Sequence, residues 1–481
     1  MRNMPPTPHN FRVDFANADP RNPLNFSSSK KWSIVSVPIL FTVLVSSTAS
    51  AYAMGVPNMM KEIHCTEFQA TIGLSIYALG FGVVPFFTAS LSESVGRQPF
   101  YLVSAAGCLF AHLMAALSQN GPTIIVARFL QGSFGGAVTI VGGTIADLWL
   151  PHERGLPMSI FSAAAFAGNG LGPVFSGWVV ENQTVGWRWI QWIHMIFFAL
   201  CLVVLLIVMR ETRSSVLLSR IAKDMREEEG DSRYFAAGED ECNLQGLLAV
   251  SCTRPFYLLV KEPVVMSFSI WISFVWGVYY CMLARSIPGI FKTLHNFTPG
   301  ELGLAYLPIV IGSVLGFITG LWQEKMYRER VSRKGPEARL YFACISAVFF
   351  PMGMFLYAWS AFPSVSWVLL ELGIVVCVWA TFGIYVSVIS YLTDCFGPFA
   401  SSALAAQSLL RNVTATVFPL FLDRMFRAWS YRWANTLFAC VALLLVAIPY
   451  VLLIYGPRHR EHSGFSNRLL CSRTEVESSV G

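Results

Sequence analysis

Charged residues are scarce in this chain of 481 residues. Asp, Glu, Lys and Arg make up 13% of it, 54% of it is hydrophobic, and the mean hydropathy is +0.54. Soluble globular domains carry about 25% charged residues. This composition excludes a soluble globular enzyme of the same length, and it predicts a membrane protein.

Three further absences narrow the function class. The 11 cysteines form no C-x-x-C pair, which excludes a disulfide framework or a cysteine-based metal site. The first residues, MRNMPPTPHNF, hold no apolar run of the kind found in a cleavable signal peptide, so the first span is expected to direct insertion. No segment resembles a phosphate-binding loop, so ATP is not expected to drive the protein. Neither a cofactor nor a metal is expected.

Long apolar runs, in contrast, are abundant. A membrane-spanning helix needs about 20 mostly apolar residues, and the sequence contains twelve such windows. The predicted fold is therefore an all-α polytopic membrane protein with twelve transmembrane helices. The windows are 33–54, 70–92, 100–118, 122–147, 156–180, 189–209, 264–288, 300–322, 339–360, 366–392, 401–423 and 433–455.

One hydrophilic stretch divides the twelve windows into six and six. The predicted domains are two six-helix bundles, a central cytoplasmic loop and two tails, with bounds 33–209, 264–455, 210–263, 1–32 and 456–481. The central loop begins with RETRSSVLLSRIAKDMREEEGD, which predicts a short amphipathic helix and then a flexible acidic stretch. Two bundles that move about a shared site are typical of transporters.

The distribution of basic residues predicts the orientation. With both termini in the cytoplasm, 25 of the 34 Lys and Arg residues lie on the cytoplasmic side and 6 lie outside. Such an asymmetry indicates cytoplasmic termini. It also accounts for the net charge of +6, so no nucleic-acid partner is expected. The sequons at Asn182 and Asn296 fall outside in this orientation and are glycosylation candidates.

Several stretches resemble motifs of the major facilitator superfamily, and within it those of the twelve-span fungal drug:proton antiporters. ASLSESVGR (89–97) resembles the first motif of the superfamily, RFLQG (128–132) its span 4 arginine motif, and GNGLGPVFSG (168–177) its span 5 antiporter motif. Further stretches resemble the fungal branch: DPRNPLNFSSSKKW, DLWLPHERG, GWRWIQWI, RETRSSVLLSR, RPFYLLVKEP, DCFGPFASSALAA and FPLF. The resemblance extends over nearly the whole chain and implies the major facilitator fold and proton-coupled export.

The sequence departs from these motifs at three positions. Ala89 stands where the first motif begins with Gly, and Gln98 replaces its second basic residue. Ser176 replaces the first Gly of the final pair in span 5. These small or polar replacements leave the fold expectation intact, and they bear on how firmly the cytoplasmic side closes.

The span 5 motif concentrates poor helix formers in one apolar window. Its residues are Gly168, Gly172, Pro173 and Gly177. Gly168, Gly172 and Ser176 recur every four residues, a spacing that allows a neighbouring helix to approach closely. Pro173 frees the carbonyl of Asn169 and predicts a bend, and the Asn169 side chain is a candidate partner for that carbonyl. We expect this helix to lie where the two halves meet; passive packing within a bundle is the alternative.

Four charged residues lie inside the predicted spans and more than one residue from either end, where charge is costly. By the resemblance, Arg128 is the arginine associated with proton transfer; a structural arginine that holds backbone carbonyls is the alternative. Glu371 is the second candidate for proton coupling, with an interfacial residue that faces water as its alternative. Arg285 is expected to extend to the outer face, and Arg411 to face the cavity or a partner.

Further charges cluster at the predicted cytoplasmic ends of the spans. The candidate residues are Glu93, Gly96, Arg97, Asp147, Glu324, Arg328 and Asp394. Glu93 and Arg97 share their spacing with Glu324 and Arg328 at the corresponding turn of the other half. Glu93 is also expected to face the start of span 11, capped by Ser401 or Ser402. Charge-assisted hydrogen bonds among these groups would close this side, and we interpret them, mainly on the resemblance, as a cytoplasmic gate.

The central cavity is expected to be aromatic. The cavity candidates are Trp276, Tyr279, Tyr280, Tyr385 and Arg411. An aromatic, weakly polar cavity favours amphipathic or cationic organic molecules. His112 and His194 lie in apolar stretches and are expected to be packed without a further role.

Together these features predict a proton-coupled antiporter that exports small organic molecules, such as a drug, a toxin or a secondary metabolite. It is expected to be a monomer in the cell membrane, with the lipid bilayer, protons and its substrate as partners. The alternatives are a proton symporter for nutrient uptake and a non-transporting membrane sensor or enzyme. The span 5 motif favours antiport. A membrane enzyme would need a cluster of His, Asp or Cys at the membrane face, and none is seen.

Overall fold

The computed structural model is almost entirely helical over the residues it describes. These are residues 11–16, 19–150, 153–182, 184–231, 233–236, 244–396 and 400–462. Eleven helices in this part of the chain are long and apolar enough to cross a membrane. The sheet found among the described residues is a single parallel pair, β1 (Arg12–Val13) with β2 (Phe235–Ala236).

The first six predicted spans all form helices. They are α1 (Ser28–Glu62), α2 (Glu67–Val95), α3 (Arg97–Ala116), α4 (Gly121–Gly135) continued by the 3-10 helix η3 (Gly136–Ile140) and α5 (Val141–Leu148), α6 (Gly155–Glu181) and α7 (Arg188–Val208). Helix α1 packs against α6 and α7, and α2 and α3 both pack against α4. Side-chain caps begin several of these helices: Thr66 forms a capping box with Gln69 at α2, and Asn120 accepts from the backbone of Thr123 at α4.

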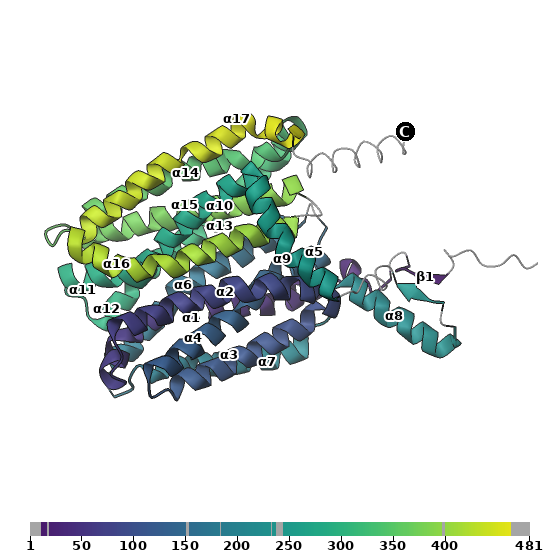
Figure 1. Ribbon diagram of the computed structural model, residues 1–481, viewed down its shortest axis with the longest axis horizontal. Helices are drawn as coiled ribbons and strands as arrows, with labels where there is room; N and C mark the ends of the chain where they lie inside the picture. Colours follow the sequence, from purple (N-terminus) through teal and green to yellow (C-terminus); the bar gives the residue numbers. More distant parts are fainter. Residues whose placement is uncertain are drawn as a thin grey trace, which may run out of the picture.

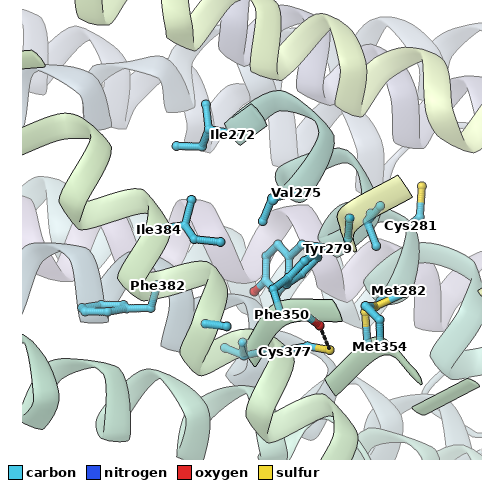
Figure 2. Close-up of a cluster of buried hydrophobic side chains, with 14 of the residues drawn as sticks. Ile272, Val275, Tyr279, Cys281, Met282, Phe350, Met354, Cys377, Phe382 and Ile384 are labelled. Carbon is cyan, nitrogen blue, oxygen red and sulfur yellow. Dashed lines mark hydrogen bonds between the residues drawn. The ribbon is translucent and has the colours of Figure 1, made fainter. Parts of the chain in front are cut away.

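The second half repeats this arrangement with more interruptions. Its helices are α10 (Pro263–Cys281) continued by the π-helical turn η4 (Met282–Ser286) and α11 (Ile287–Leu294), α12 (Pro299–Leu304), α13 (Leu307–Lys334), the 3-10 helix η5 (Gly335–Arg339), α14 (Leu340–Trp359), α15 (Trp367–Phe396), α16 (Ala400–Leu445) and α17 (Ala447–His462). They enclose a buried core of aromatic and aliphatic side chains. Figure 2 shows part of this core, in which Tyr279 of α10 lies among side chains that include Phe350 and Cys377.

The eleventh and twelfth predicted spans meet within α16. Ser430 has a positive φ of 62°, so two helices join there. Window 401–423 is helical but is not among the eleven strongly apolar helices, because it carries polar side chains such as Arg411 and Asn412. Both of these side chains are buried against the neighbouring helices, which makes their polarity compatible with the membrane.

The segment between the two halves contains two helices. Helix α8 (Ser214–Glu229) occupies the stretch predicted to be amphipathic. Helix α9 (Leu244–Lys261) lies in the part of the loop for which no helix is predicted, and it packs against α2 of the first half and against α10 and α16 of the second. We call the end of the molecule that carries β1, α8 and α9 the terminal end, and the opposite end, with α11 and α12, the distal end (Figure 1).

Candidate functional site

Helix α6 lies between the two halves and presents glycine on two faces. A Cβ atom at Gly168 would lie 2.7 Å from the carbonyl oxygen of Val43, and one at Gly172 would lie 2.5 Å from that of Ser47. Both contacts are with the backbone of α1. The predicted stripe therefore does form a close helix contact, but with a helix of the same half rather than with the other half.

The contact between halves uses the other face of α6. A Cβ atom at Gly170 would lie 2.8 Å from a methyl carbon of Val310, and one at Gly177 would overlap the carbonyl oxygen of Pro299. These partners belong to α13 and α12. Gly170 and Gly177 are seven residues apart, which places them on one helix face. Gly170, although it lies off the four-residue stripe, is thus also in close contact with a neighbouring helix.

Pro173 lies inside α6 without ending the helix. The Asn169 side chain does not contact its own carbonyl; its Nδ2 donates to the carbonyl of Ala165 at 3.0 Å. Ser176 is fully buried and donates to the carbonyl of Gly172 at 2.8 Å. Both polar side chains are thus satisfied within the helix, as a membrane requires.

Arg128 is completely buried in the first half and holds three helices together. Its guanidinium donates to the carbonyl oxygens of Thr48 in α1 at 3.1 Å and of Gly73 in α2 at 3.2 Å. It also lies 4.4 Å from the ring centres of Tyr52 and of Tyr77. The structural alternative stated for this arginine is therefore present in the structure, while its role in proton coupling stays a prediction.

A chain of side chains links Arg128 to a buried histidine. Arg128 donates to Oε1 of Gln131 at 2.9 Å, so the amide nitrogen of Gln131 faces Oε1 of Gln191 at 3.0 Å. Nδ1 of His112 lies 2.9 Å from this oxygen and 3.2 Å from Nε2 of Gln131. Because arginine can only donate, the orientations of the two glutamine amides follow, and Nδ1 of His112 can donate to Gln191 or accept from Gln131 according to its tautomer.

The second nitrogen of His112 faces a hydroxyl that can reverse its role. Nε2 lies 3.2 Å from Oγ1 of Thr48, which also lies 2.9 Å from the carbonyl of Leu44. Thr48 can donate to a neutral imidazole, or accept from a charged one while donating to Leu44. His194 stacks on the His112 ring with centroids 5.3 Å apart, and Ser47 contacts its Nε2 at 3.0 Å. Both histidines are buried, as expected, and both also contact polar side chains.

Most of the cavity candidates gather around Phe166 of α6. The rings of Trp276, Tyr279 and Tyr385 lie 5.5–5.6 Å from the Phe166 ring, centre to centre. Arg411 lies over Trp276 at 4.6 Å and over Tyr385 at 5.2 Å. These residues come from α6, α10, α15 and α16, so the cluster contains side chains of both halves.

Tyr280, the remaining candidate, points to a different neighbour. Its hydroxyl donates to the carbonyl of Leu74 in α2 at 3.0 Å. Together with Leu74, Ala49 and Asn169 it lines a small cavity. Tyr280 therefore belongs to the contact between α10 and α2 rather than to the aromatic cluster.

The distal end is held closed by contacts between the halves. The Glu181 carboxylate accepts from the backbone N–H of Gly300 at 2.7 Å. Arg427 forms an ion pair with Glu67, and Arg285 donates to Thr71. Arg285 thus contacts α2 four residues after its first residue, at the distal end, and its expected place at the outer face stays a prediction.

At the terminal end, Arg97 is the centre of a buried charge cluster. Its Nε donates to Asp147 at 3.2 Å, and one terminal nitrogen donates to Ser92 at 2.6 Å. The backbone N–H of Arg97 donates to Glu211 at 3.0 Å, so this carboxylate caps the start of α3. Gly96 has φ +112°, and a Cβ atom there would overlap Glu211. The predicted pair of Arg97 and Asp147 therefore forms; the side chain of Glu93 lies outside the described residues.

The second half has a cluster of its own, but not around the arginine that was predicted. Arg339 donates to Glu324 at 2.5 Å and to Asp394 at 3.0 Å. Arg328 is largely exposed, and its Nε lies 3.7 Å from Glu324. Arg339, rather than Arg328, is the structural counterpart of Arg97.

The remaining predicted residues lie at the distal end. Glu371 is half-buried near the start of α15 and makes no hydrogen bond or ion pair with any residue in the described part. Asn182 and Asn296 are both exposed in distal loops, and their use as glycosylation sites stays a prediction. No group of three or more His, Cys, Asp or Glu residues that could hold a metal ion is found in the part of the chain that the structure describes.

Comparison with known proteins identifies the family. The family model for the Major Facilitator Superfamily matches residues 38–419. The chain belongs to this superfamily. It is 32% identical over 470 residues to the major facilitator superfamily multidrug transporter mdrA of Aspergillus fumigatus, covering 95% of this chain and 76% of that protein. It is 33% identical over 471 residues to the efflux pump MFS2 of Trichophyton rubrum, covering 95% and 77% respectively.

A solved structure shows the same fold. The proton:xylose symporter XylE aligns with a TM-score of 0.65 at 17% identity, covering 89% of this chain and 97% of that one. The predicted major facilitator fold is thereby confirmed. The protein is a multi-pass membrane transporter and not an enzyme, and its family carries small-molecule substrates.

Several important residues were not singled out from the sequence. Glu211 lies in the stretch RETRSSVLLSR, which was noted only for its resemblance to the fungal branch. Arg339 lies eleven residues after Arg328, and no sequence signal marks it. Gln131 follows Arg128 within RFLQG, at the three-residue spacing that places side chains on one helix face.

Proposed function

We propose that this transporter exports small organic molecules in exchange for protons, by alternating access between its two halves. The names of the relatives as a multidrug transporter and as an efflux pump support export. The observation that carries the proposal is the contact of α6 with α12 and α13, where Gly170 lies against Val310 and Gly177 against the backbone of Pro299. Small residues allow helices of the two halves to pack closely here, and this contact must change when the halves move apart.

Alternating access also needs contacts that exist in only one state. Glu181 with Gly300, and Arg427 with Glu67, join the halves at the distal end and must separate when that end opens. The clusters around Arg97 and Arg339, in contrast, each lie within one half at the terminal end. We infer that they fix the helix ends against which the terminal end closes, so that their part in gating is indirect rather than that of a latch between the halves.

We place the coupled proton on His112. The network that runs from Arg128 through Gln131 and Gln191 orients the imidazole, and Thr48 accommodates either protonation state. Arg128 and the stacked ring of His194 are the other titratable groups beside it. In this proposal Arg128 orients the network and does not itself carry the proton, because its N–H groups already donate to backbone carbonyls and to Gln131. Glu371 is the competing carrier.

Everted vesicles with an acidic lumen test the coupling. Aromatic acids, amides and amines are offered outside, and at least one is expected to accumulate in the lumen until a protonophore is added. An acid is the clearest probe, because passive diffusion would drive it out of an acidic lumen. Undiminished accumulation after collapse of the gradient, with ATP present, would overturn proton antiport. Proton-dependent movement out of the lumen would indicate symport instead.

Two matched variants test the carrier. His112→Gln keeps a neutral side chain that can hydrogen-bond, and it is expected to abolish gradient-driven accumulation while substrate counterflow continues. Glu371→Gln is expected to retain both activities. The reverse result would identify Glu371 as the residue that carries the coupled proton, and the proposal of proton antiport would still stand.

A further inference from the structure

The central cluster contains an arginine whose charge no carboxylate balances. Arg411 is 5% exposed, and its guanidinium lies 4.6 Å from the ring centre of Trp276 and 5.2 Å from that of Tyr385. Phe166, from the other half, contacts both of these rings. Arg411 forms no ion pair with any residue that the structure describes. Buried arginines are normally paired or fully hydrogen-bonded.

Its hydrogen-bonding capacity is mostly unused. The one hydrogen bond it makes within the described chain runs from a terminal nitrogen to Oγ of Ser408 at 3.3 Å. Among the residues that the structure describes, Nε of Arg411 has no partner, and neither has Nε2 of Gln407, which lies one helical turn earlier and is 2% exposed. Residues four apart lie on the same face of a helix. Two unsatisfied donor groups, one of them charged, therefore share one face of α16.

Arg128 shows what a structural arginine looks like in this protein. It is as deeply buried, yet it donates to the backbone of Thr48 and Gly73 and to Gln131. The interior also holds Arg285, whereas Glu371, the carboxylate within a span, lies towards the distal end. The centre of the molecule is consequently positive, and a positive, water-poor site favours negative charge.

We propose that the substrate is an aromatic organic anion. Its carboxylate, or an equivalent acidic group, binds Arg411 and Gln407, and its ring lies among Phe166, Trp276 and Tyr385. This inference rests on the proposed transport function and names its substrate class. It replaces the expectation of a cationic substrate, because Arg411 already occupies the aromatic faces that a cation would use and repels a second positive charge.

Export of an anion also fits the direction of transport. A negative charge that leaves a cell with an inside-negative potential moves down that potential, and a proton that enters moves down it as well. An exchange of the two is therefore driven by both components of the proton gradient, whereas export of a cation in exchange for one proton gains nothing from the potential.

Three probes of one shape test the charge preference: 1-naphthoate, 1-naphthamide and 1-naphthylmethylammonium. Calorimetry on the purified, detergent-solubilised full chain is expected to rank naphthoate first and the ammonium last. Arg411→Gln should weaken naphthoate binding about tenfold or more, since a charged hydrogen bond is lost. Naphthamide binding should change less than about twofold, and Arg411→Lys should lie in between.

A second variant removes the site without removing the arginine. Gln407→Glu places a carboxylate one turn from Arg411, where it would take up the guanidinium and exclude naphthoate. Ser408→Ala is the matched control and should retain the preference for naphthoate. A merely structural role for Arg411 would change thermal stability and leave the ranking of the three probes unaltered.

The proposal is overturned if the ammonium binds as tightly as naphthoate, if no probe binds, or if Arg411→Gln retains the naphthoate preference. Binding in detergent needs no gradient, so it separates this proposal from proton coupling. Naphthoate binding without gradient-driven transport would support the anion site and reject the antiporter, and gradient-driven transport of the ammonium alone would do the opposite.

Discussion

The two charge clusters at the terminal end are built alike but differ in burial. In the first half, the side chains of Arg97 and Asp147 are 5% and 10% exposed, and the carboxylate of Glu211 also caps the start of α3. In the second half, Arg339, Glu324 and Asp394 are 14%, 23% and 27% exposed. Corresponding positions of a repeated fold can thus hold an arginine–carboxylate pair either in a protein interior or near water.

This difference in burial determines how much each cluster contributes to the free energy of unfolding. Removing one partner from a buried pair leaves an uncompensated charge, whereas an exposed pair contributes little and is screened by salt. We therefore expect the first cluster to be a rigid part of its half, and the second to be weaker and more sensitive to ionic strength.

Arg97→Ala is expected to have the largest effect. It leaves Asp147 with Arg213, 3.4 Å away, as its remaining described ion-pair partner, and should lower the free energy of unfolding by about 3 kcal/mol. Thermal unfolding of the purified protein, together with the rate of thiol labelling from the terminal side, measures the change. Arg97→Lys keeps the charge and should lose less. Equal unfolding temperatures for Arg97→Ala and the wild type would contradict the proposed rigidity.

Gly96→Ala should have the second largest effect and lower the free energy of unfolding by about 2 kcal/mol. It adds a side chain at a positive φ, and that side chain would overlap Glu211. Gly186→Ala is the matched control: Gly186 has φ +75° and nothing within 4 Å of an added Cβ atom. The control should show only the backbone component, of about 1 kcal/mol. If both variants lose the same stability, Glu211 does not contribute through this contact.

Arg339→Ala is expected to cost about 1–2 kcal/mol, since its two ion pairs are partly hydrated. The loss should shrink when the salt concentration is raised, whereas the loss caused by Arg97→Ala should not. Unfolding at low and high ionic strength measures both. A loss for Arg339→Ala as large and as independent of salt as that for Arg97→Ala would remove the distinction between the clusters.

Arg328→Ala should have the smallest effect, within about 0.5 kcal/mol, because its side chain is 61% exposed and lies 3.7 Å from Glu324. Export rates normalised to the amount of protein in the membrane should also remain unchanged. A transport defect in this variant would indicate that Arg328 does act with Glu324, as the spacing of charges predicts.

The sequence predicted the helices, and the end of the molecule at which the charge clusters lie, better than it predicted which residues contact one another. Hydropathy located the spans because membrane insertion depends on local composition, and the pair of Arg97 and Asp147 followed from the resemblance. Arg339 was missed because equal spacing along two turns does not determine which arginine turns inwards. Likewise, the four-residue spacing of Gly168 and Gly172 predicted a close contact, but periodicity does not say whether α1 or α13 is on the other side.

The contacts of Arg128 have a consequence for how the molecule can move. One guanidinium joins the carbonyls of Thr48 and Gly73, and so fixes α1 and α2 to α4. A change in the angle between any two of these helices would break hydrogen bonds to a charged donor in a water-free interior. We therefore expect α1, α2 and α4 to move together when the first half moves against the second. A substitution at Arg128 should slow the transport cycle, because these helices could then move relative to one another in ways that do not contribute to transport.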